Sequence, residues 1–297
     1  MPELPEVETI RRDLAVVLSG QTISAIHIFS PKTVQPAAAF FKKSLVGQKV
    51  VKIERRGKLL IFALADSKRV AQVKFLLIHL KMTGQLIYRD RKQEIAGGHS
   101  IGKASFLEAV GNLPNKHTRV IIELQSGGRL FFNDLRKFGY LKIVSQTELD
   151  KILKNNYGPE PLTPEFSLSS LQATLRNKKT KIKALLLDQK RIAGLGNIYV
   201  DESLFAAKIR PERLAGSLKT AEVKKLWQAI NQVIKLAIKH RGTTFNNYRD
   251  SDGRKGNYSR FLQVYGKRGE ACPVCGRPLV RIKVAGRGTH YCAHCQK

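Results

Sequence analysis

The chain begins with Met1-Pro-Glu-Leu-Pro-Glu-Val-Glu8. The other motifs of the sequence can be related to this stretch. A small second residue permits removal of the initiator methionine, which would leave Pro2 as a chain end with a free secondary amine. An α-amino group has a pKa of roughly 7.7–8, against roughly 10.4 for lysine, so much more of it is neutral and nucleophilic near neutral pH. Attack of this amine on a sugar carbon would give a cationic Schiff base, with Glu3 beside it as an acid or base. On these eight residues alone, a proline that only starts a helix is the simpler interpretation.

A helix is expected directly behind this start. Apolar residues recur at helical spacing and Gly20 follows as a stop. Glu6 and Glu8 would lie in the first turn, where the helix dipole favours acidic side chains. The apolar set comprises Val7, Ile10, Leu14, Val17 and Leu18. The nucleophile would therefore be anchored on a rigid element.

About eight short strands without intervening helices follow, which favours a β-sandwich or barrel. In 118–125, apolar and polar residues alternate with the two-residue period of a half-buried strand. The stretch 89–116 is long for an ordinary connection and is interpreted as an insertion. The predicted strands are 22–29, 49–56, 58–65, 70–80, 84–89, 118–125, 129–133 and 138–144.

From about residue 145 the pattern becomes helical. Proline-rich 156–164 predicts a linker. The polar loop 242–260 is expected to be either a disordered connection or a mobile lid. Helices are predicted near 168–176, 180–188, 198–207 and 219–240. We expect an amino-terminal domain at 1–145, a linker at 146–164, a helical domain at 165–260 and a cysteine hairpin at 261–297.

All four cysteines lie at the carboxyl end, as Cys272-Pro-Val-Cys275 and Cys292-Ala-His-Cys295. Two such pairs at this separation predict four thiolates around one structural Zn²⁺, with no open position for catalysis. His294, inside the second pair, is a weaker alternative ligand. Strands predicted at 279–284 and 289–291 would place Arg287 at the tip of a zinc-bound hairpin.

The chain is strongly basic, with 53 Lys and Arg against 23 Asp and Glu and a formal net charge of +30. Such an excess indicates a polyanionic partner, most commonly nucleic acid, and binding that weakens with salt. Charge alone does not distinguish a scaffold from an enzyme. No secretory signal and no membrane-length apolar run is visible. With cysteines at metal-ligand spacing, this favours a cytoplasmic, nucleoid-associated protein without a membrane partner.

The start Pro2-Glu-Leu-Pro-Glu-Val-Glu-Thr9 resembles the amino terminus of the formamidopyrimidine-DNA glycosylases, which excise oxidised purines. Further motifs resemble that family in the same linear order: Arg55-Arg-Gly-Lys58, His79-Leu-Lys-Met-Thr-Gly84, Asp134-Leu-Arg-Lys-Phe-Gly139, Gly194-Leu-Gly-Asn197 and Gly286-Arg-Gly-Thr-His-Tyr-Cys292. The resemblance covers nearly the whole chain. It implies an α+β fold of two domains, an amino-terminal β-sandwich with flanking helices and a carboxyl-terminal helix-two-turns-helix bundle with a zinc-finger β-hairpin.

The resemblance also implies roles for individual residues. Pro2 would be the nucleophile, Glu3 an acid in opening of the sugar ring, Lys58 a phosphate ligand and proton donor, and Arg287 a phosphate ligand with a part in the final elimination. Met82, Arg136 and Phe138 would fill the space left by an extruded base. From the residues alone, Met82 and Phe138 fit a buried core equally well. The remaining implied DNA contacts are His79, His117, Lys178, Asn197, Tyr199 and Tyr248, the last closing over the lesion.

The predicted function is thus a bifunctional DNA glycosylase and abasic-site lyase acting on double-stranded DNA with an oxidised purine. We expect a monomer. One alternative is the sister enzyme for oxidised pyrimidines, against which Leu4 and the motif 136–139 argue. Another is a non-catalytic, zinc-containing nucleic-acid-binding protein. This alternative does not explain why Pro2, Glu3 and Lys58 occur together in one chain. Two features depart from the family pattern, the stretch 89–116 and a lysine, Lys81, where glycine is common.

Overall fold

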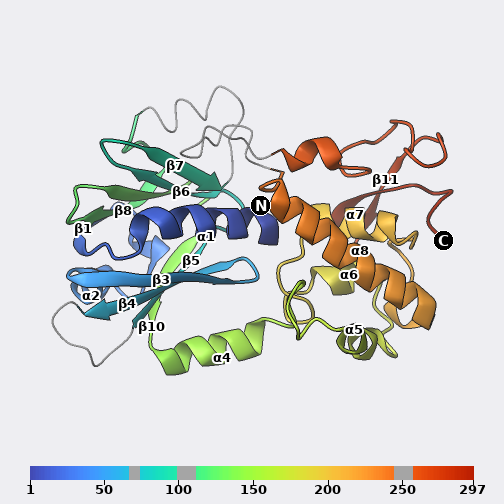
Figure 1. Ribbon diagram of the computed structural model, residues 1–297, viewed down its shortest axis with the longest axis horizontal. Helices are drawn as coiled ribbons and strands as arrows, with labels where there is room; N and C mark the ends of the chain where they lie inside the picture. The colour runs from blue at the N-terminus through green and yellow to red at the C-terminus, as the bar shows by residue number, and fades with distance from the viewer. Residues whose placement is uncertain (67–73, 99–111, 244–256) are drawn as a thin grey trace. The chain divides into compact units, whose positions relative to one another are not determined.

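The computed structural model describes residues 1–66, 74–98, 112–243 and 257–297, and contacts divide the chain into two units (Figure 1). The first unit comprises Met1–Leu153 and His240–Asn257, and the second comprises Lys154–Lys239 and Tyr258–Lys297. Within the described ranges, no helix has both the length and the apolar character needed to cross a membrane.

The first unit is a sandwich of two five-stranded sheets, in the orders β2-β10-β5-β4-β3 and β1-β8-β9-β6-β7. Neighbouring strands are antiparallel, except for the short parallel pair of β2 and β10. The predicted sandwich is confirmed. The strands are β1 (Ile23–Ile28), β2 (Val34–Gln35), β3 (Gln48–Arg56), β4 (Leu59–Asp66), β5 (Lys74–His79), β6 (Gly84–Arg89), β7 (Glu94–Gly98), β8 (Thr118–Leu124), β9 (Arg129–Asp134) and β10 (Tyr140–Val144).

Helix α1 (Leu4–Leu18) closes one side of this sandwich. It packs against β3 and β7, the edge strands of the two sheets, and runs between the sheets in Figure 1. The predicted apolar stripe, including Val7, Ile10 and Leu14, lies in the shared core. A second helix, α2 (Ala38–Leu45), contacts β1 and β2, and a 3₁₀ turn spans Pro31–Thr33. Because α1 is fixed along its length, the chain start has a defined place at one end of the sandwich.

The interpretation of 89–116 as an insertion is wrong for its first part. Strand β7 pairs with β6 along its whole length, and its Ala96 is buried in an outer cluster with Ile87, Ile121 and Phe131. This part of the stretch is therefore an integral edge strand. Glu94–Gly98 contains few large apolar side chains, so the sequence did not indicate a strand there. Residues 99–111 lie outside the described ranges.

The second unit is helical and carries the cysteine hairpin. The four predicted helices are present as α5 (Leu168–Leu175), α6 (Ile182–Leu187), α7 (Asn197–Ala206) and α8 (Thr220–Lys239), with 3₁₀ turns at Ala215–Ser217 and Tyr258–Phe261. Helix α7 contacts α6, α8 and the hairpin strand β12. The hairpin itself is β11 (Val280–Val284) with β12 (Arg287–Tyr291).

One helix in the predicted linker was missed. Helix α4 (Gln146–Asn156) occupies the first part of 146–164. Its apolar residues Leu149, Ile152 and Leu153 recur at helical spacing, but the stripe is short and only Leu149 is buried. A capping signal was nevertheless present, because Ser145 Oγ accepts from the Glu148 backbone N–H while the Glu148 carboxylate accepts from the Ser145 backbone N–H.

Candidate active site and nucleic-acid interface

The chain start is buried at the first turn of α1. Pro2 and Glu3 are buried, with Glu3 only 3 % exposed. The Glu3 backbone N–H donates to Glu6 Oε2 at 2.9 Å, which satisfies one of the unpaired donors at the helix start. Glu6 thus fixes the residue adjacent to Pro2.

Lys58 lies close to the same chain end. It follows Gly57, which has a φ of +57°, in the tight turn between β3 and β4, and its side chain is buried. The pKa of the Met1 amino group is lowered from its usual 8.0, first by burial and also by the charge of Lys58, while Glu3 and Glu6 oppose the shift. Removal of Met1 would move the free amine to Pro2, one residue away among the same groups. These surroundings favour a neutral, nucleophilic amine.

An ion-pair network ties the Lys58 turn to α1. Arg55 Nε lies 3.1 Å from Glu8 Oε2, and Arg55 Nη1 donates to the Gly57 carbonyl at 2.9 Å. Glu8 also accepts from Arg11 and Arg12 on its own helix. The sequence indicated only a helix-dipole role for Glu8, and no local pattern revealed that Arg55 would reach it. The network holds the element carrying Lys58 against the element carrying Pro2.

Replacement of Glu8 by glutamine is expected to remove a pH-dependent part of the stability. Burial alone would raise the Glu8 pKa, but hydrogen bonds from Arg11 and Arg12 and the Arg55 charge lower it to about 2. A carboxyl whose pKa is depressed in the folded state stabilises the fold above its unfolded pKa, and this stabilisation is lost as the pH falls from about 4.5 to about 2. The contribution at neutral pH is about 3 kcal/mol. Urea unfolding at pH 7 and pH 3 measures it.

The matched control for Glu8 is Glu54→Gln, since Glu54 pairs with Lys52 at an exposed position. This variant is expected to unfold within about 0.5 kcal/mol of the unmodified chain at both pH values. An equal loss for Glu8→Gln at pH 7 and pH 3 would contradict the assigned ionic role.

His79 lies at the same end of the sheet, at the last residue of β5. It is in register with Leu59 of β4, the residue after Lys58, and with Tyr140 of β10. Its Nδ1 accepts from the Lys81 backbone N–H at 3.0 Å. Burial, Lys81 and Lys58 lower the His79 pKa to about 3. His79 is therefore a neutral imidazole whose Nε2–H is the remaining donor, suited to a phosphate oxygen.

Lys81, which stands where glycine is common in the family, lies in the turn after His79. Its φ is +50°, a conformation that glycine adopts without strain. This accounts for the preference for glycine that the resemblance implies here. The Lys81 ammonium lies 5.7 Å from the centre of the Tyr140 ring. Met82, the next residue, is half-buried at this crossover from β5 to β6.

Asp134 organises the adjacent crossover from β9 to β10. Its carboxylate accepts from Thr83 Oγ1, from the Arg136 backbone N–H at 3.1 Å and from the Gly139 backbone N–H at 2.7 Å. The turn between these residues projects outward. Phe138 is 53 % exposed, and the Arg136 guanidinium lies 4.8 Å from the centre of its ring. Phe138 is thus a surface residue, not the core residue that the sequence equally allowed.

His117 belongs to this arrangement through the backbone. Its carbonyl accepts from the Asp134 backbone N–H at 2.9 Å. The side chain is half-buried, and burial followed by the charges of Lys116 and Arg119 lowers its pKa. The β-sandwich therefore brings His79, Met82, His117, Arg136 and Phe138 onto neighbouring turns, linked by Thr83 and Asp134.

Asp134→Ala is expected to disorder the turn that carries Arg136 and Phe138. Displacement of such groups by about 1 Å can cost roughly 100-fold in rate, so the predicted excision of oxidised bases should fall by about 10- to 100-fold. Affinity for an undamaged duplex should change little, because backbone contacts dominate it. Single-turnover excision and duplex titration measure the two quantities. Thr83→Val removes a hydroxyl that donates to Asp134 and accepts from the Arg136 backbone N–H at 3.0 Å, but it leaves both backbone hydrogen bonds to the Asp134 carboxylate. It is the control and should have the smaller effect; a larger one would contradict the central role of Asp134.

The segment after α8 returns to α1. Thr243 donates its backbone N–H to Glu6 Oε1 at 2.8 Å, and Arg241 Nη2 lies 2.6 Å from Asp13 Oδ2. Gly242 has a φ of +78°, and a side chain there would meet Glu6. Glu6 therefore joins the chain start to the beginning of the predicted lesion-capping loop. Tyr248 and residues 244–256 lie outside the described ranges.

In the second unit, Arg287 is presented by a rigid turn. It is exposed and opens β12 directly after Ala285 and Gly286, whose φ values of +49° and +76° suit a two-residue hairpin turn. The carbonyl of the next residue, Gly288, accepts from Asn197 Nδ2 at 2.9 Å and from Lys183 Nζ at 3.2 Å. The hairpin tip is thus fixed to the start of α7.

A buried ion pair lies beneath this contact. Lys183 Nζ and Asp201 Oδ1 are 2.6 Å apart with both side chains fully buried, and Asp201 Oδ2 accepts from the His290 backbone N–H at 2.8 Å. No sequence pattern indicated this pair. The helical period of α6 gave no sign that one lysine would face inward.

The three remaining predicted DNA-contacting residues of this unit differ in exposure. Lys178 and Asn197 are half-buried. Tyr199 is completely buried, with its ring centre 5.7 Å from that of Tyr258. The predicted DNA contact of Tyr199 is therefore corrected to a core position in α7, because its side chain has no exposed surface to offer a ligand.

The four cysteines fit a tetrahedral zinc site. Their Sγ atoms all lie within 4.8 Å of one another, with Cys272–Cys295 at 3.9 Å and Cys275–Cys292 at 3.6 Å. A tetrahedron with Zn–S bonds of about 2.3 Å has edges of about 3.8 Å, which matches these separations. The cysteines pack with a small core that includes Phe205, Val264 and Leu279. One structural Zn²⁺ held by these thiolates would stabilise the segment that presents Arg287.

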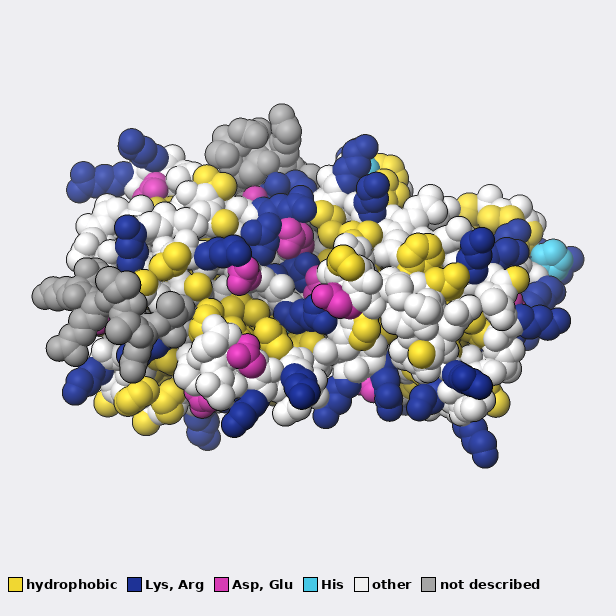
Figure 2. Space-filling view, turned by 60° about the horizontal axis from the view of Figure 1, so that its bottom comes forward, with side chains coloured by type: hydrophobic (Ala, Val, Ile, Leu, Met, Phe, Trp, Pro, Cys, Tyr) yellow, Lys and Arg dark blue, Asp and Glu magenta, His cyan; other side chains and the backbone are white. Residues whose placement is uncertain are grey.

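The surface carries the charge expected of a polyanion-binding protein. On the face shown in Figure 2, Lys and Arg side chains are scattered over the whole surface, with fewer Asp and Glu between them. The charge therefore extends beyond the predicted site residues.

Comparison with known families matches the chain in three consecutive parts. Residues 1–141 match the formamidopyrimidine-DNA glycosylase N-terminal domain, 157–248 the H2TH domain of the same enzymes, and 269–297 the zinc finger found in FPG and IleRS. The chain belongs to the formamidopyrimidine-DNA glycosylase family. A formamidopyrimidine-DNA glycosylase of Desulforamulus reducens is 45 % identical over 301 aligned positions, covering 100 % of this chain and 99 % of the relative.

Solved structures agree with this family assignment. Wild-type Lactococcus lactis Fpg in complex with DNA containing N7-benzyl-Fapy-dG has a TM-score of 0.84 at 37 % identity, with both chains fully covered. MutM in complex with DNA containing carbocyclic 8-oxo-G has a TM-score of 0.83 at 36 % identity, again with both chains fully covered. The two-domain fold with a helix-two-turns-helix domain and a zinc-finger hairpin is thus that of the formamidopyrimidine-DNA glycosylases.

Proposed function

We propose that this chain removes oxidised purines from double-stranded DNA through the amine of Pro2 and then cuts the strand at the resulting abasic site. It is a DNA glycosylase and abasic-site lyase of base excision repair, and its substrates are 8-oxoguanine and formamidopyrimidines. The observation that carries the residue-level mechanism is the convergence of Glu3, Glu6 and Lys58 on the charge of the chain end. We expect it to act as a monomer on chromosomal DNA in the cytoplasm.

The reaction begins with removal of Met1, which frees the Pro2 nitrogen. Its lone pair attacks the sugar C1′, the bond to the base breaks, and the base leaves with a proton. Glu3 transfers a proton to the ring oxygen as the sugar opens, and the nitrogen and C1′ become a cationic Schiff base. Loss of a C2′ proton then expels the 3′ phosphate, and a second elimination expels the 5′ phosphate.

Lys58 and His79 act on the phosphates beside the lesion. Lys58 is a buried cation held near the amine by the Arg55 contact with Gly57. His79 offers a neutral Nε2–H from the adjacent strand. A cation and a directed donor at one end of the sheet fix the sugar of the extruded nucleotide against the amine.

The turns at Met82 and 134–139 occupy the space left by the base. Phe138 supplies an exposed aromatic wedge and Arg136 a guanidinium able to contact the unpaired base opposite. His117 would contact the backbone beside them. This assignment favours purine repair over the sister enzyme for oxidised pyrimidines, which lacks the Arg-x-Phe-Gly motif. The loop containing Tyr248 would close over the extruded base.

In the second unit, Asn197, Lys178 and Arg287 would bind phosphates. Arg287 reaches the DNA from the zinc-supported hairpin and assists the eliminations. Asn197 holds the hairpin through Gly288 with its amide nitrogen, while the positive end of α7 favours an anion nearby. Zinc supplies structural support alone, because all four positions are thiolates.

Single-turnover excision on matched duplexes tests the substrate class. The chain, with Met1 removal verified by mass spectrometry, is incubated with duplexes carrying one 8-oxoguanine, one formamidopyrimidine or one dihydrothymine. Fast release of both purine lesions, with strand cutting on both sides, is the expected result. Faster release of dihydrothymine would move the chain to the pyrimidine branch. Binding without any release would support the non-catalytic alternative.

A further inference from the structure

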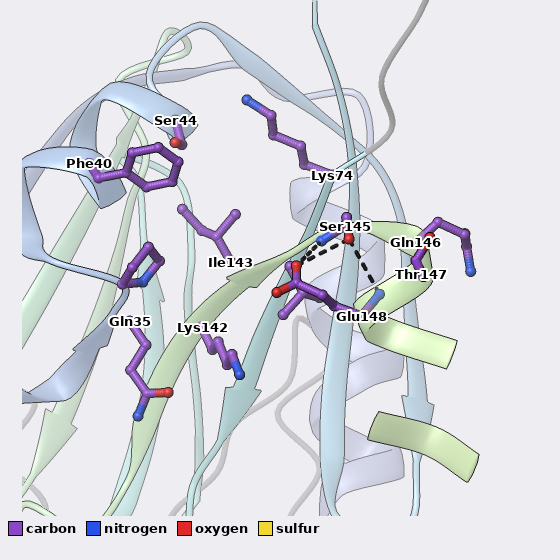
Figure 3. A pocket seen from close by; sticks show the side chains of 12 residues that line it. Gln35, Phe40, Ser44, Lys74, Lys142, Ile143, Ser145, Gln146, Thr147 and Glu148 are labelled. Atoms are coloured by element: carbon purple, nitrogen blue, oxygen red, sulfur yellow. Dashed lines mark hydrogen bonds between the residues drawn. The ribbon is translucent and has the colours of Figure 1, made fainter. Parts of the chain in front are cut away.

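A large hollow lies in the first unit, away from the residues assigned to DNA. It has a volume of about 1120 Å³ and is bounded by α2, β5, β10 and the start of α4 (Figure 3). In Figure 3, Phe40 comes from one side, Lys74 and Lys142 from the strands, and Ile143 from the floor. We call this hollow the β10 groove.

The β10 groove combines an apolar surface with positive charge. Phe40 is 56 % exposed, although it is a large aromatic residue on a short helix. Lys74 and Lys142 are both half-buried at the strands. Among the described lining residues, the one acidic side chain is that of Glu148, which accepts hydrogen bonds from the backbone N–H and hydroxyl of Ser145. An occupant with apolar and acidic groups would complement this lining.

The edge of β10 offers backbone groups to the same space. On the side away from β5, β2 pairs with β10 only at Leu141 and Lys142. Among the described residues, Ile143 and Val144 have no strand partner on that side. An extended peptide could continue this edge, as peptides do at other exposed sheet edges.

The groove and the catalytic end lie at opposite ends of β10. Tyr140 is in register with His79 at the catalytic end, whereas Val144 lies at the groove. Four residues of strand separate them by roughly 13 Å. The groove is therefore separate from the turns assigned to DNA.

We propose that the β10 groove binds an extended acidic peptide segment of a partner protein, with a bulky apolar side chain of the peptide packed against Phe40. The carboxylates of the peptide pair with Lys74 and Lys142, and its backbone extends β10 at Ile143 and Val144. A nucleic-acid strand fits less well, because a phosphate backbone gains nothing from Phe40 and the apolar floor. The site would attach the repair enzyme to another protein without occupying its DNA surface.

The test uses a fluorescein-labelled peptide with Leu-Phe between runs of Asp and Glu, titrated against the full chain. Saturable binding in the micromolar range is expected. Phe40→Ala, and Lys74→Glu combined with Lys142→Glu, should each weaken it about tenfold or more. Replacement of Leu-Phe by Ser-Ser in the peptide should have a similar effect. The matched charge control is Lys224→Glu with Lys225→Glu on exposed positions of α8, and it should leave affinity within about twofold.

Competition separates the groove from the DNA surface. Peptide affinity is expected to remain unchanged when the chain is saturated with a duplex carrying an uncleavable abasic analogue, and the groove variants should keep their excision rate. Displacement of the peptide by duplex, unchanged affinity in the groove variants, or absence of saturable binding would each overturn the proposal. A loss of duplex affinity in the Lys74 and Lys142 variant without any peptide binding would make the groove a DNA surface instead.

Discussion

No covalent adduct is expected with an 8-oxoguanine duplex and borohydride when the chain carries an amino-terminal extension that leaves Pro2 in a peptide bond. An amide nitrogen has no available lone pair, so it cannot attack C1′. Strand cutting should fall by about 10⁴-fold or more, as when other enzymes lose a nucleophile. Duplex affinity should stay within a few-fold, because phosphate contacts dominate it. Borohydride trapping and single-turnover cutting measure these quantities.

Pro2→Gly distinguishes loss of the amine from loss of the ring. After removal of Met1 this variant keeps a primary amine, but its Schiff base can lose a proton and become a neutral imine, which withdraws electrons less strongly. Reduced but detectable trapping is therefore expected, in contrast to none for the extended chain. Equal cutting by the extended and processed chains would exclude Pro2 as the nucleophile.

The pH profile adds an independent test of the site. Burial and Lys58 lower the pKa of the Met1 amino group from 8.0. We expect the same surroundings to act on the Pro2 amine, so adduct formation should rise with pH and level off below the pH expected of a free α-amine. Lys58→Met removes a positive charge and should move the midpoint to higher pH. Glu3→Gln removes a negative charge and should move it to lower pH. An unchanged midpoint in both variants would contradict the proposed proximity.

Sequence patterns were sufficient wherever the determining interactions are local. The stripe from Val7 to Leu18 predicted α1, and the four cysteines predicted a zinc site. Both depend on spacing along one element. The resemblance added the order of the motifs from Pro2 to Arg287. These features define the fold and the chemical class.

The remaining features depend on contacts between distant segments. The Glu8–Arg55 pair joins residues 47 positions apart, and the Glu6–Thr243 contact joins residues 237 positions apart. Neither has a periodic or compositional signal. Tyr199 was assigned to DNA because it follows Asn197 in a motif. A residue two positions further along a helix, however, points to a different face of that helix. Side-chain direction in the fold, not motif membership, decides exposure.

The largest effect on the free energy of unfolding is expected for substitution of Lys183. Lys183→Met leaves Asp201 as an uncompensated charge in a fully buried position, and breaking such a pair typically costs about 3–5 kcal/mol. The hairpin contact is lost as well, because Lys183 also donates to the Gly288 carbonyl. Urea unfolding, zinc release to a chromogenic chelator and duplex affinity should all show the change.

The double variant Lys183→Met with Asp201→Asn shows whether this effect comes from the buried charge. The introduced asparagine would be neutral and its side-chain oxygen could still accept from the His290 backbone N–H, so the remaining cost should be roughly 1–3 kcal/mol, that of an imperfect buried hydrogen bond. Zinc retention and duplex affinity should recover in parallel, since both depend on the position of the hairpin and of Arg287. If Lys183 instead bound DNA directly, removal of the Asp201 charge could restore stability but not affinity. Recovery of both together therefore assigns the defect of Lys183→Met to the unpaired Asp201 charge and excludes a direct DNA contact of Lys183.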